Sequence, residues 1–213
     1  MPLPASEVVP LFGHSYLDDL LASEKYAVVM SGTSASPPAY HHEFIVANRF
    51  FVPGCIDATV WLNHKKGDEF VGLYRAGKLA SGHTPTVMHG AVQGFMFDEI
   101  LGAAATTMAR VVTGNPELAF MTRNLLTQYL RPVMIPNDLV VHARVTNVEG
   151  LKDIDKVRDI EILGSLYQLK DWVAYREALA RGEAAVEPKP LAKGRAEFAK
   201  VDLSSHLKRA QKL

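Results

Sequence analysis

Two adjacent carboxylates, Asp98 and Glu99, lie within the strongly apolar stretch of residues 95–101. An unpaired carboxylate is costly to bury among apolar side chains, so its presence there needs a reason. Catalysis supplies one, because a carboxylate can activate a water molecule or attack a carbonyl carbon. Gly90 lies in a glycine turn eight residues before Asp98. At a helix start, free backbone N–H groups and the helix dipole favour negative charge.

The hydrophobic pattern predicts the elements that hold these residues. Residues 90–112 are small or apolar on nearly every side, which is typical of a helix surrounded by protein, and Gly114 and Pro116 end it. A further helix is expected over residues 171–181, with Asp171 as its N-cap. Strand-like runs occupy residues 42–46, 58–63, 69–75, 119–129, 139–148, 156–169 and 193–201.

This order of elements predicts an α+β fold in which an antiparallel sheet wraps around one long central helix. Residues 1–13 are expected to be irregular, and a short helix is expected over residues 14–23. The expected divisions are an N-terminal extension with a short helix and a loop (1–40), one domain with a helical insertion at about 171–190 (41–203), and a basic tail (204–213).

Composition narrows the function. Lysine plus arginine equals aspartate plus glutamate, 23 each, so the net charge gives no reason to expect a nucleic acid or a membrane surface as partner. The single cysteine, Cys55, excludes an intrachain disulfide and fits a reducing compartment. No segment is apolar for long enough to span a bilayer, and the acidic start does not resemble a targeting signal. We expect a cytoplasmic protein without a metal site.

Five short motifs occur in one order: Gly82-His83, residues 87–91 (VMHGA), residues 97–99 (FDE), residues 121–125 (MTRNL) and residues 129–133 (YLRPV). Together they resemble the hotdog-fold acyl-CoA thioesterases of the PaaI-like thioesterase superfamily. The likeness is to the branch with a histidine–glycine–glycine turn and an aspartate eight residues after the first glycine. It extends over roughly residues 70–148 and implies a hotdog fold.

The resemblance also implies roles for individual residues. The Gly90 N–H would polarise the thioester carbonyl, and Asp98 would be the general base or the nucleophile. Thr122 would hold the water or the carboxylate. His83 would orient substrate or water, and His89 would brace the turn.

Three more residues are expected to border the substrate. Ala91 replaces the second glycine of the motif, and its methyl group narrows the approach to the helix start. Glu99 is either a structural partner of Asp98 or the base itself if the register differs by one residue. Arg123 is one of several basic residues that could hold the phosphates of coenzyme A.

Helix geometry predicts that two chains share one site. Gly90 and Asp98 are eight residues apart, which is about 12 Å along a helix, so one carbonyl cannot touch both in a single chain. A second protomer with its helix antiparallel would bring one chain's Gly90 to the other's Asp98. We therefore expect a homodimer, or a dimer of dimers, that hydrolyses acyl-CoA thioesters to the free acid and CoA. No metal or redox cofactor is implied, and coenzyme A enters as part of the substrate.

Two alternatives remain. The first is a hydratase or dehydratase on the same fold, acting on enoyl- or hydroxyacyl-thioesters, in which His83 would share proton transfer and no free thiol would appear. The second is a non-catalytic acyl-CoA sensor, which would bind acyl-CoA tightly without turnover. The presence of Asp98 favours an enzyme over a sensor.

Overall fold

Seven antiparallel strands form one sheet in the computed structural model, which describes residues 4–34, 52–115, 118–145 and 159–201. The strand order β1-β2-β3-β5-β6-β7-β4 leaves β1 and β4 at the two edges. Across the sheet the strands are β1 (Tyr26–Thr33), β2 (Ile56–His64), β3 (Glu69–Ala76), β5 (Asn137–Arg144), β6 (Asp159–Gln168), β7 (Ala192–Val201) and β4 (Ala119–Tyr129).

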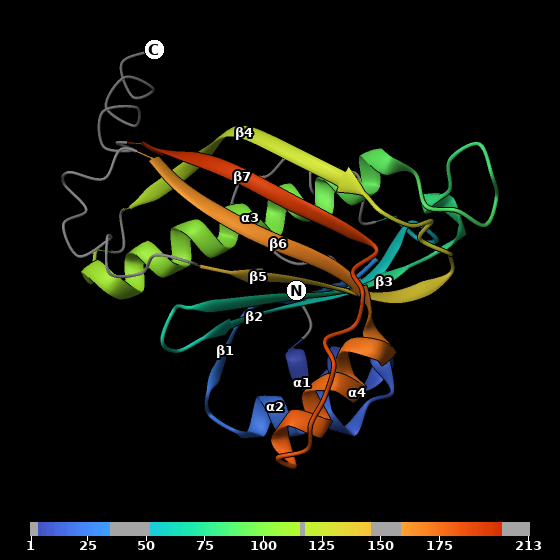
Figure 1. Cartoon of the computed structure of the whole chain (residues 1–213), viewed down its shortest axis with the longest axis horizontal. Helices are drawn as coiled ribbons and strands as arrows, with labels where there is room; N and C mark the ends of the chain where they lie inside the picture. Colours follow the sequence, from blue (N-terminus) through green and yellow to red (C-terminus); the bar gives the residue numbers. More distant parts are fainter. Residues whose placement is uncertain (1–3, 35–51, 116–117, 146–158, 202–213) are drawn as a thin grey trace.

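The long helix α3 (Gly90–Thr113) lies along one face of this sheet (Figure 1). It begins after His89, the N-cap residue, and ends at Gly114, which has the left-handed backbone (φ 68°) that glycine adopts without strain. Phe97, Ile100 and Leu101 on this helix are completely buried against the strands. One long helix wrapped by an antiparallel sheet is the hotdog fold, and the predicted fold class is confirmed.

Glycines in the strands allow α3 to approach the sheet closely. A Cβ atom at Gly194 on β7 would lie 2.4 Å from Cδ1 of Phe97. A Cβ atom at Gly72 on β3 would lie 2.1 Å from Cδ1 of Ile100. Gly164 on β6 faces the helix in the same way. Because Gly72, Gly164 and Gly194 have no side chains, α3 packs directly against the strands there. We call this contact layer the seat of α3, and it sets the distance of Asp98 from the sheet.

Short helices cover the opposite face of β1, β2, β3 and β5, so the sheet separates two apolar cores. They gather below the sheet in Figure 1: α1 (Ala5–Val8), the 3-10 turn η1 (Val9–Phe12), α2 (Ser15–Ala22) and α4 (Leu169–Ala180). Trp172 of α4 is only 1% exposed and packs into this second core. A further 3-10 turn, η3 (Lys78–Ala80), leads toward α3.

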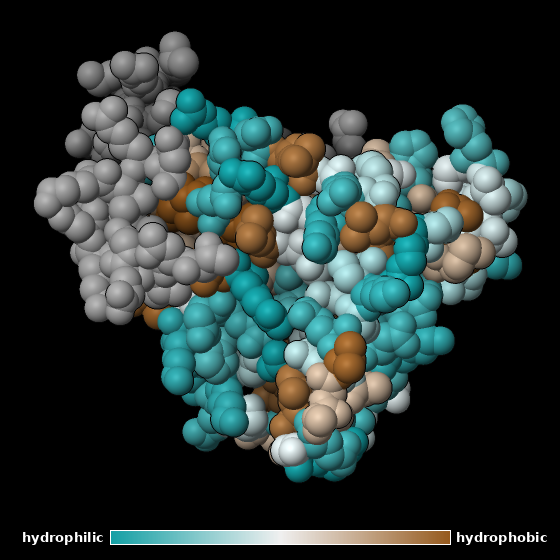
Figure 2. All heavy atoms as spheres, viewed as in Figure 1, coloured by the Kyte–Doolittle hydropathy of each residue, from teal (hydrophilic) through white to brown (hydrophobic). Residues whose placement is uncertain are grey.

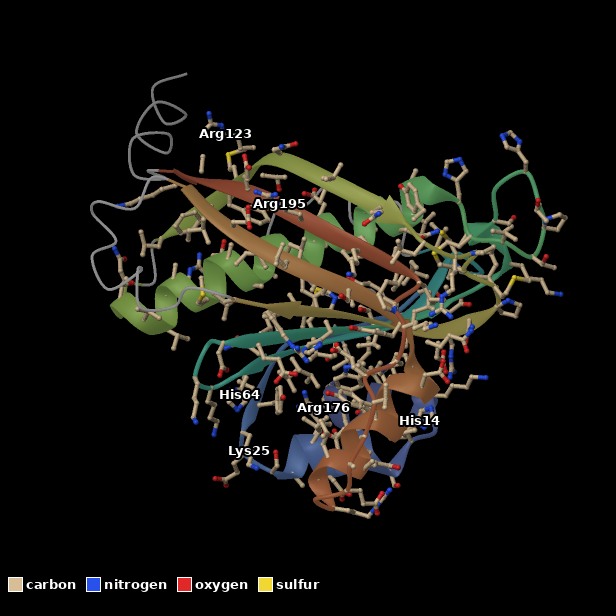
Figure 3. All side chains as sticks on the ribbon, in the orientation of Figure 1. His14, Lys25, His64, Arg123, Arg176 and Arg195 are labelled. Carbon is tan, nitrogen blue, oxygen red and sulfur yellow. The ribbon has the colours of Figure 1, made fainter. Side chains whose placement is uncertain are left out.

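A polar network fastens α4 to the sheet beside this second core. Glu69 on β3 pairs with His142 at 2.7 Å and with Arg176 at 2.8 Å, and accepts a hydrogen bond from the Tyr26 hydroxyl at 2.7 Å. Burial alone would raise the pKa of Glu69, but His142, Arg176 and Tyr26 outweigh it and lower that pKa to about 2. Figure 3 shows Arg176 between α4 and the sheet.

Most predicted elements within the described residues are present, with three differences. The strand β1 was not predicted, although it pairs along β2. Residues 5–12, expected to be irregular, form α1 and η1. The N-cap of α4 is Gln168, so the prediction of Asp171 is wrong; Asp171 lies in the first turn, where its charge suits the helix dipole. The predicted strand at residues 42–46 lies outside the described residues.

Within the described part of the chain, no helix has both the length and the apolar character needed to cross a membrane. The cytoplasmic location and the division of the chain at residues 40 and 203 stay predictions.

Candidate active site

The start of α3 leaves one backbone donor available. The Ala91 N–H donates to Nδ1 of His89 at 3.0 Å, and the Val92 and Gln93 N–H groups donate to the His89 carbonyl oxygen at 3.1 and 3.4 Å. Among the residues that the structure describes, the Gly90 N–H has no protein acceptor. An exposed donor at a helix start can bind an anion or a developing oxyanion.

Tyr129, the last residue of β4, contacts the same turn. Its hydroxyl donates to the Gly90 carbonyl oxygen at 2.9 Å, and a Cβ atom at position 90 would lie 3.1 Å from both Cζ and the hydroxyl oxygen of Tyr129. The side chain is nevertheless 54% exposed. In the sequence, this tyrosine is part of the motif at residues 129–133, and no role is predicted for it. Its place at the end of a strand, directly before Leu-Arg-Pro, was the available signal.

The carboxylate Asp98 lies two turns further along α3 and is held from β4. The Thr122 hydroxyl donates to Oδ1 of Asp98 at 2.7 Å. Asp98 is half-buried, so its second oxygen can meet water or substrate. The pairing of β4 with β7 shifts register between Thr122 and Asn124. Arg123 lies at this irregularity and projects away from the sheet (Figure 3).

The neighbouring carboxylate, Glu99, has a different environment. Burial, and secondarily the charge of Asp98, raise the pKa of Glu99 to about 7. Its Oε2 atom is buried and has no hydrogen-bond partner among the described residues. The two adjacent carboxyl groups therefore differ in kind: Asp98 accepts a bond from Thr122, whereas Glu99 is readily protonated near neutral pH.

The predicted residues thus fall into two groups within one chain. The helix-start half holds His89, Gly90 and Ala91, and the carboxylate half holds Asp98, Glu99 and Thr122, with Arg123 beside it. About 12 Å of helix separates Gly90 from Asp98. His83 is exposed on the turn between the paired residues Ser81 and Met88, next to the helix-start half.

Neither half lines a pocket of about 150 Å³ on the other face of the sheet, around His142, Ser165 and Tyr167. Among the described residues, no three or more His, Cys, Asp or Glu side chains are grouped to hold a metal ion. The arrangement offers hydrolytic chemistry in two parts: an N–H donor for a developing oxyanion in one half and an oriented carboxylate in the other.

Comparison with known proteins gives one family match. Residues 86–150 match the family model described as the thioesterase superfamily. This segment holds α3, β4 and β5, and with them both halves of the candidate site. No curated protein sequence matches significantly.

Several solved structures are similar to the chain. One, a thioesterase superfamily protein, is 20% identical over 66% of this chain and 53% of its own (TM-score 0.45), so the chain spans about half of its length. The PaaI protein of the phenylacetic acid degradation operon of E. coli is 12% identical over 64% of this chain and 75% of its own (TM-score 0.45). Zebra fish thioesterase superfamily member 2 is 15% identical over 73% of this chain and 86% of its own (TM-score 0.47).

The match to the family model covers four of the five motifs on which the sequence resemblance rests, those at residues 87–91, 97–99, 121–125 and 129–133, whereas Gly82-His83 lies outside it. It supports acyl-thioester hydrolysis as a general class of activity. The protein has a hotdog fold, and its predicted resemblance to the thioesterase superfamily is confirmed over residues 86–150.

Proposed function

We propose that this protein hydrolyses acyl-CoA thioesters, with Asp98 of one chain and the Gly90 N–H of a second chain acting on the same thioester. The observation that carries the proposal is the Gly90 N–H, which is the donor of the first helical turn left without a protein acceptor among the described residues. A second observation supports it: Thr122 holds one oxygen of Asp98 and leaves the other available.

The reaction follows from these groups. In one route, Asp98 takes a proton from water as the water oxygen attacks the thioester carbon. The carbonyl electrons move to its oxygen, where the Gly90 N–H and the dipole of α3 stabilise the negative charge. Collapse of this intermediate breaks the carbon–sulfur bond, and the proton on Asp98 passes to the departing thiolate, so that CoA and the acid are released and the Asp98 carboxylate is restored. In the other route, Asp98 itself attacks the carbon, the carbon–sulfur bond breaks and CoA leaves as the thiolate. Water then hydrolyses the resulting anhydride, which gives the acid and restores the Asp98 carboxylate.

The proposal includes a homodimer paired along β4. This strand is a sheet edge, and its backbone has no strand partner on the outer side among the described residues. Met121 and Leu126 on it are both 63% exposed, which is unfavourable for an edge strand left in solvent. On the side of the molecule seen in Figure 2, apolar side chains are scattered among hydrophilic ones. The proposal places the contact at the β4 edge.

No metal or redox cofactor is part of the proposal, since the reacting water supplies the proton and hydroxyl that hydrolysis adds, the carboxylate transfers the proton, and the backbone N–H stabilises the developing charge. His83, Ala91, Glu99 and Arg123 are proposed to border the bound thioester. His89 is proposed to brace the turn through its bond to the Ala91 N–H.

The test is the release of free thiol from a panel of short, long and aromatic acyl-CoAs, with wild type beside Asp98→Asn. Asp171→Asn is the matched control, because this aspartate is exposed on α4 on the opposite face of the sheet. We expect repeated turnover in wild type and in the control, and a loss of at least about 100-fold in Asp98→Asn. Only multiple turnovers count, because Cys55 can itself contribute one thiol per chain.

The other outcomes separate the alternatives. Tight binding of acyl-CoA without thiol release would contradict the proposal and favour a sensor. Conversion of enoyl- or hydroxyacyl-CoA without thiol release, abolished by His83→Ala, would favour a hydratase.

A further inference from the structure

We propose that Tyr129 is a positioning residue: with His89 it clamps the peptide that joins Gly90 to Ala91, and so fixes the direction of the Gly90 N–H. The inference rests on the proposed function for its effect on catalysis, and on the structure alone for the clamp itself.

The clamp grips one peptide group at both ends. The carbonyl oxygen of this peptide belongs to Gly90 and accepts the bond from the Tyr129 hydroxyl at 2.9 Å. Its N–H belongs to Ala91 and donates to Nδ1 of His89 at 3.0 Å. The two bonds come from opposite sides of the turn, one from the end of β4 and one from the N-cap, so together they resist rotation of that peptide.

The clamp limits the motion of the backbone at Gly90, where a helix start and a glycine both allow it to move. The first turn of a helix lacks most of its backbone bonds and frays readily. Glycine adds the widest backbone freedom of any residue. A donor for a developing oxyanion is effective only when it points at the oxygen before the reaction begins. Fixing the peptide on one side of the Gly90 Cα leaves the N–H on its other side less freedom to turn.

The ring of Tyr129 has a second consequence. It lies so near Gly90 that a Cβ atom there would approach it to 3.1 Å, closer than ordinary van der Waals contact. The ring is also 54% exposed, so it borders the solvent side of the helix-start half. The hydroxyl therefore sets the direction of the donor, whereas the ring forms a wall beside it that the bound thioester would meet.

The two parts of the side chain can be separated by substitution. Tyr129→Phe keeps the ring and removes the hydroxyl, and we expect kcat to fall about 5- to 10-fold with KM nearly unchanged, the effect of one lost hydrogen bond. Tyr129→Ala also removes the wall, and KM should rise as well. Tyr167→Phe is the matched control, because it removes a tyrosine hydroxyl bonded to Glu187 on the other face of the sheet.

A double-mutant cycle tests whether Tyr129 acts through Gly90. Gly90→Pro removes the N–H, so Tyr129→Phe should have little further effect on kcat in that background. Equal effects of Tyr129→Phe in both backgrounds would overturn the positioning role.

Amide hydrogen exchange at Ala91 tests the clamp whatever the activity. We expect faster exchange in Tyr129→Phe than in wild type or Tyr167→Phe. Unchanged exchange would overturn the inference even in an active enzyme. Faster exchange in a protein that releases no thiol would retain the clamp and reject the proposed function.

Discussion

At the scale of single residues, the candidate site depends on groups with very little chemistry of their own. Gly90 offers only a backbone N–H, and the neighbouring N–H groups are already bonded to His89. Asp98 owes its orientation to the Thr122 hydroxyl. Each role therefore comes from placement, which a substitution of one or two atoms can test.

Two substitutions at Gly90 isolate its N–H. Proline removes the donor but is favoured at the first helical position, and His89 already has the extended backbone (φ −64°, ψ 138°) that a residue before proline needs. Alanine keeps the donor and adds the same Cβ atom beside Tyr129. We expect kcat of Gly90→Pro to be about 100- to 1000-fold below that of Gly90→Ala. Equal values in a thiol-release assay would mean that this N–H does not stabilise the oxyanion.

Glu99 should make the unfolding free energy fall with pH. Its pKa is about 7 in the folded chain, against an ordinary value of 4.5 for a glutamate, so the folded state holds the extra proton between these values. The contribution of Glu99 to the unfolding free energy is greatest below about pH 4.5 and is lost as pH rises through about 7. Relative to Glu99→Gln, wild type should lose about 3 kcal/mol over that interval in denaturant unfolding at fixed protein concentration.

Glu7→Gln is the matched control, because Glu7 is an exposed glutamate on α1. The unfolding free energy of this variant should change with pH as that of wild type does. If wild type and Glu99→Gln keep a constant difference from about pH 5 to pH 8, Glu99 is not the buried acid described above.

Single residues also show which features of the site can be predicted from the sequence. The apolar stretch around Asp98 and the turn at Gly90 were visible because their types and spacing are local features. The role of Tyr129 was not, because its bond to Gly90 joins residues 39 positions apart and depends on how β4 crosses α3. The high pKa of Glu99 was equally hidden, since it follows from burial that only the fold determines.

At the scale of elements, the seat of α3 on the sheet controls where Asp98 lies. The glycines at positions 72, 164 and 194 bring three strands close to the helix. Because Phe97 directly precedes Asp98, a displacement of the α3 backbone at Phe97 would also move the carboxylate.

Gly194→Ala tests the close packing of α3 on the sheet. The new methyl group would lie 2.4 Å from the Phe97 ring, so the helix or the strand must move, and we expect a loss of about 1–3 kcal/mol of unfolding free energy. Gly102→Ala is the control, because its methyl group meets only the Phe198 ring at 3.5 Å and alanine favours a helix. Equal stabilities in denaturant unfolding would show that the seat tolerates a side chain.

Some elements can be predicted from the pattern of neighbouring residues alone, and others cannot. The bounds of β4 agree fully with the sequence pattern, and α3 agrees within one residue. An apolar run and the glycine at position 114 define α3, whereas Pro132 follows closely on the end of β4. β1 carries exposed residues at an edge and lacks a regular alternation, so its pairing with β2 was not visible. The outer helices were also hard to assign, since α1 and η1 are only four residues each.

At the scale of the whole molecule, the helix-start half and the carboxylate half are incomplete alone. About 12 Å of α3 separates them, so no single thioester carbonyl reaches both within one chain. The sheet edge β4 passes both halves: Thr122 bonds Asp98, and Tyr129 bonds Gly90. In the proposed homodimer, a second copy paired along this edge would complete two equivalent sites.

The most direct test of this account is complementation between two inactive chains. Gly90→Pro keeps Asp98, and Asp98→Asn keeps the Gly90 N–H, so a heterodimer of the two contains one intact site and one doubly altered site. Coexpressed with different affinity tags and isolated as the heterodimer, the pair should recover about half of the wild-type thiol release per dimer. Thiol release no higher than that of the two separate variants, from a heterodimer shown to be intact, would contradict a site shared between chains.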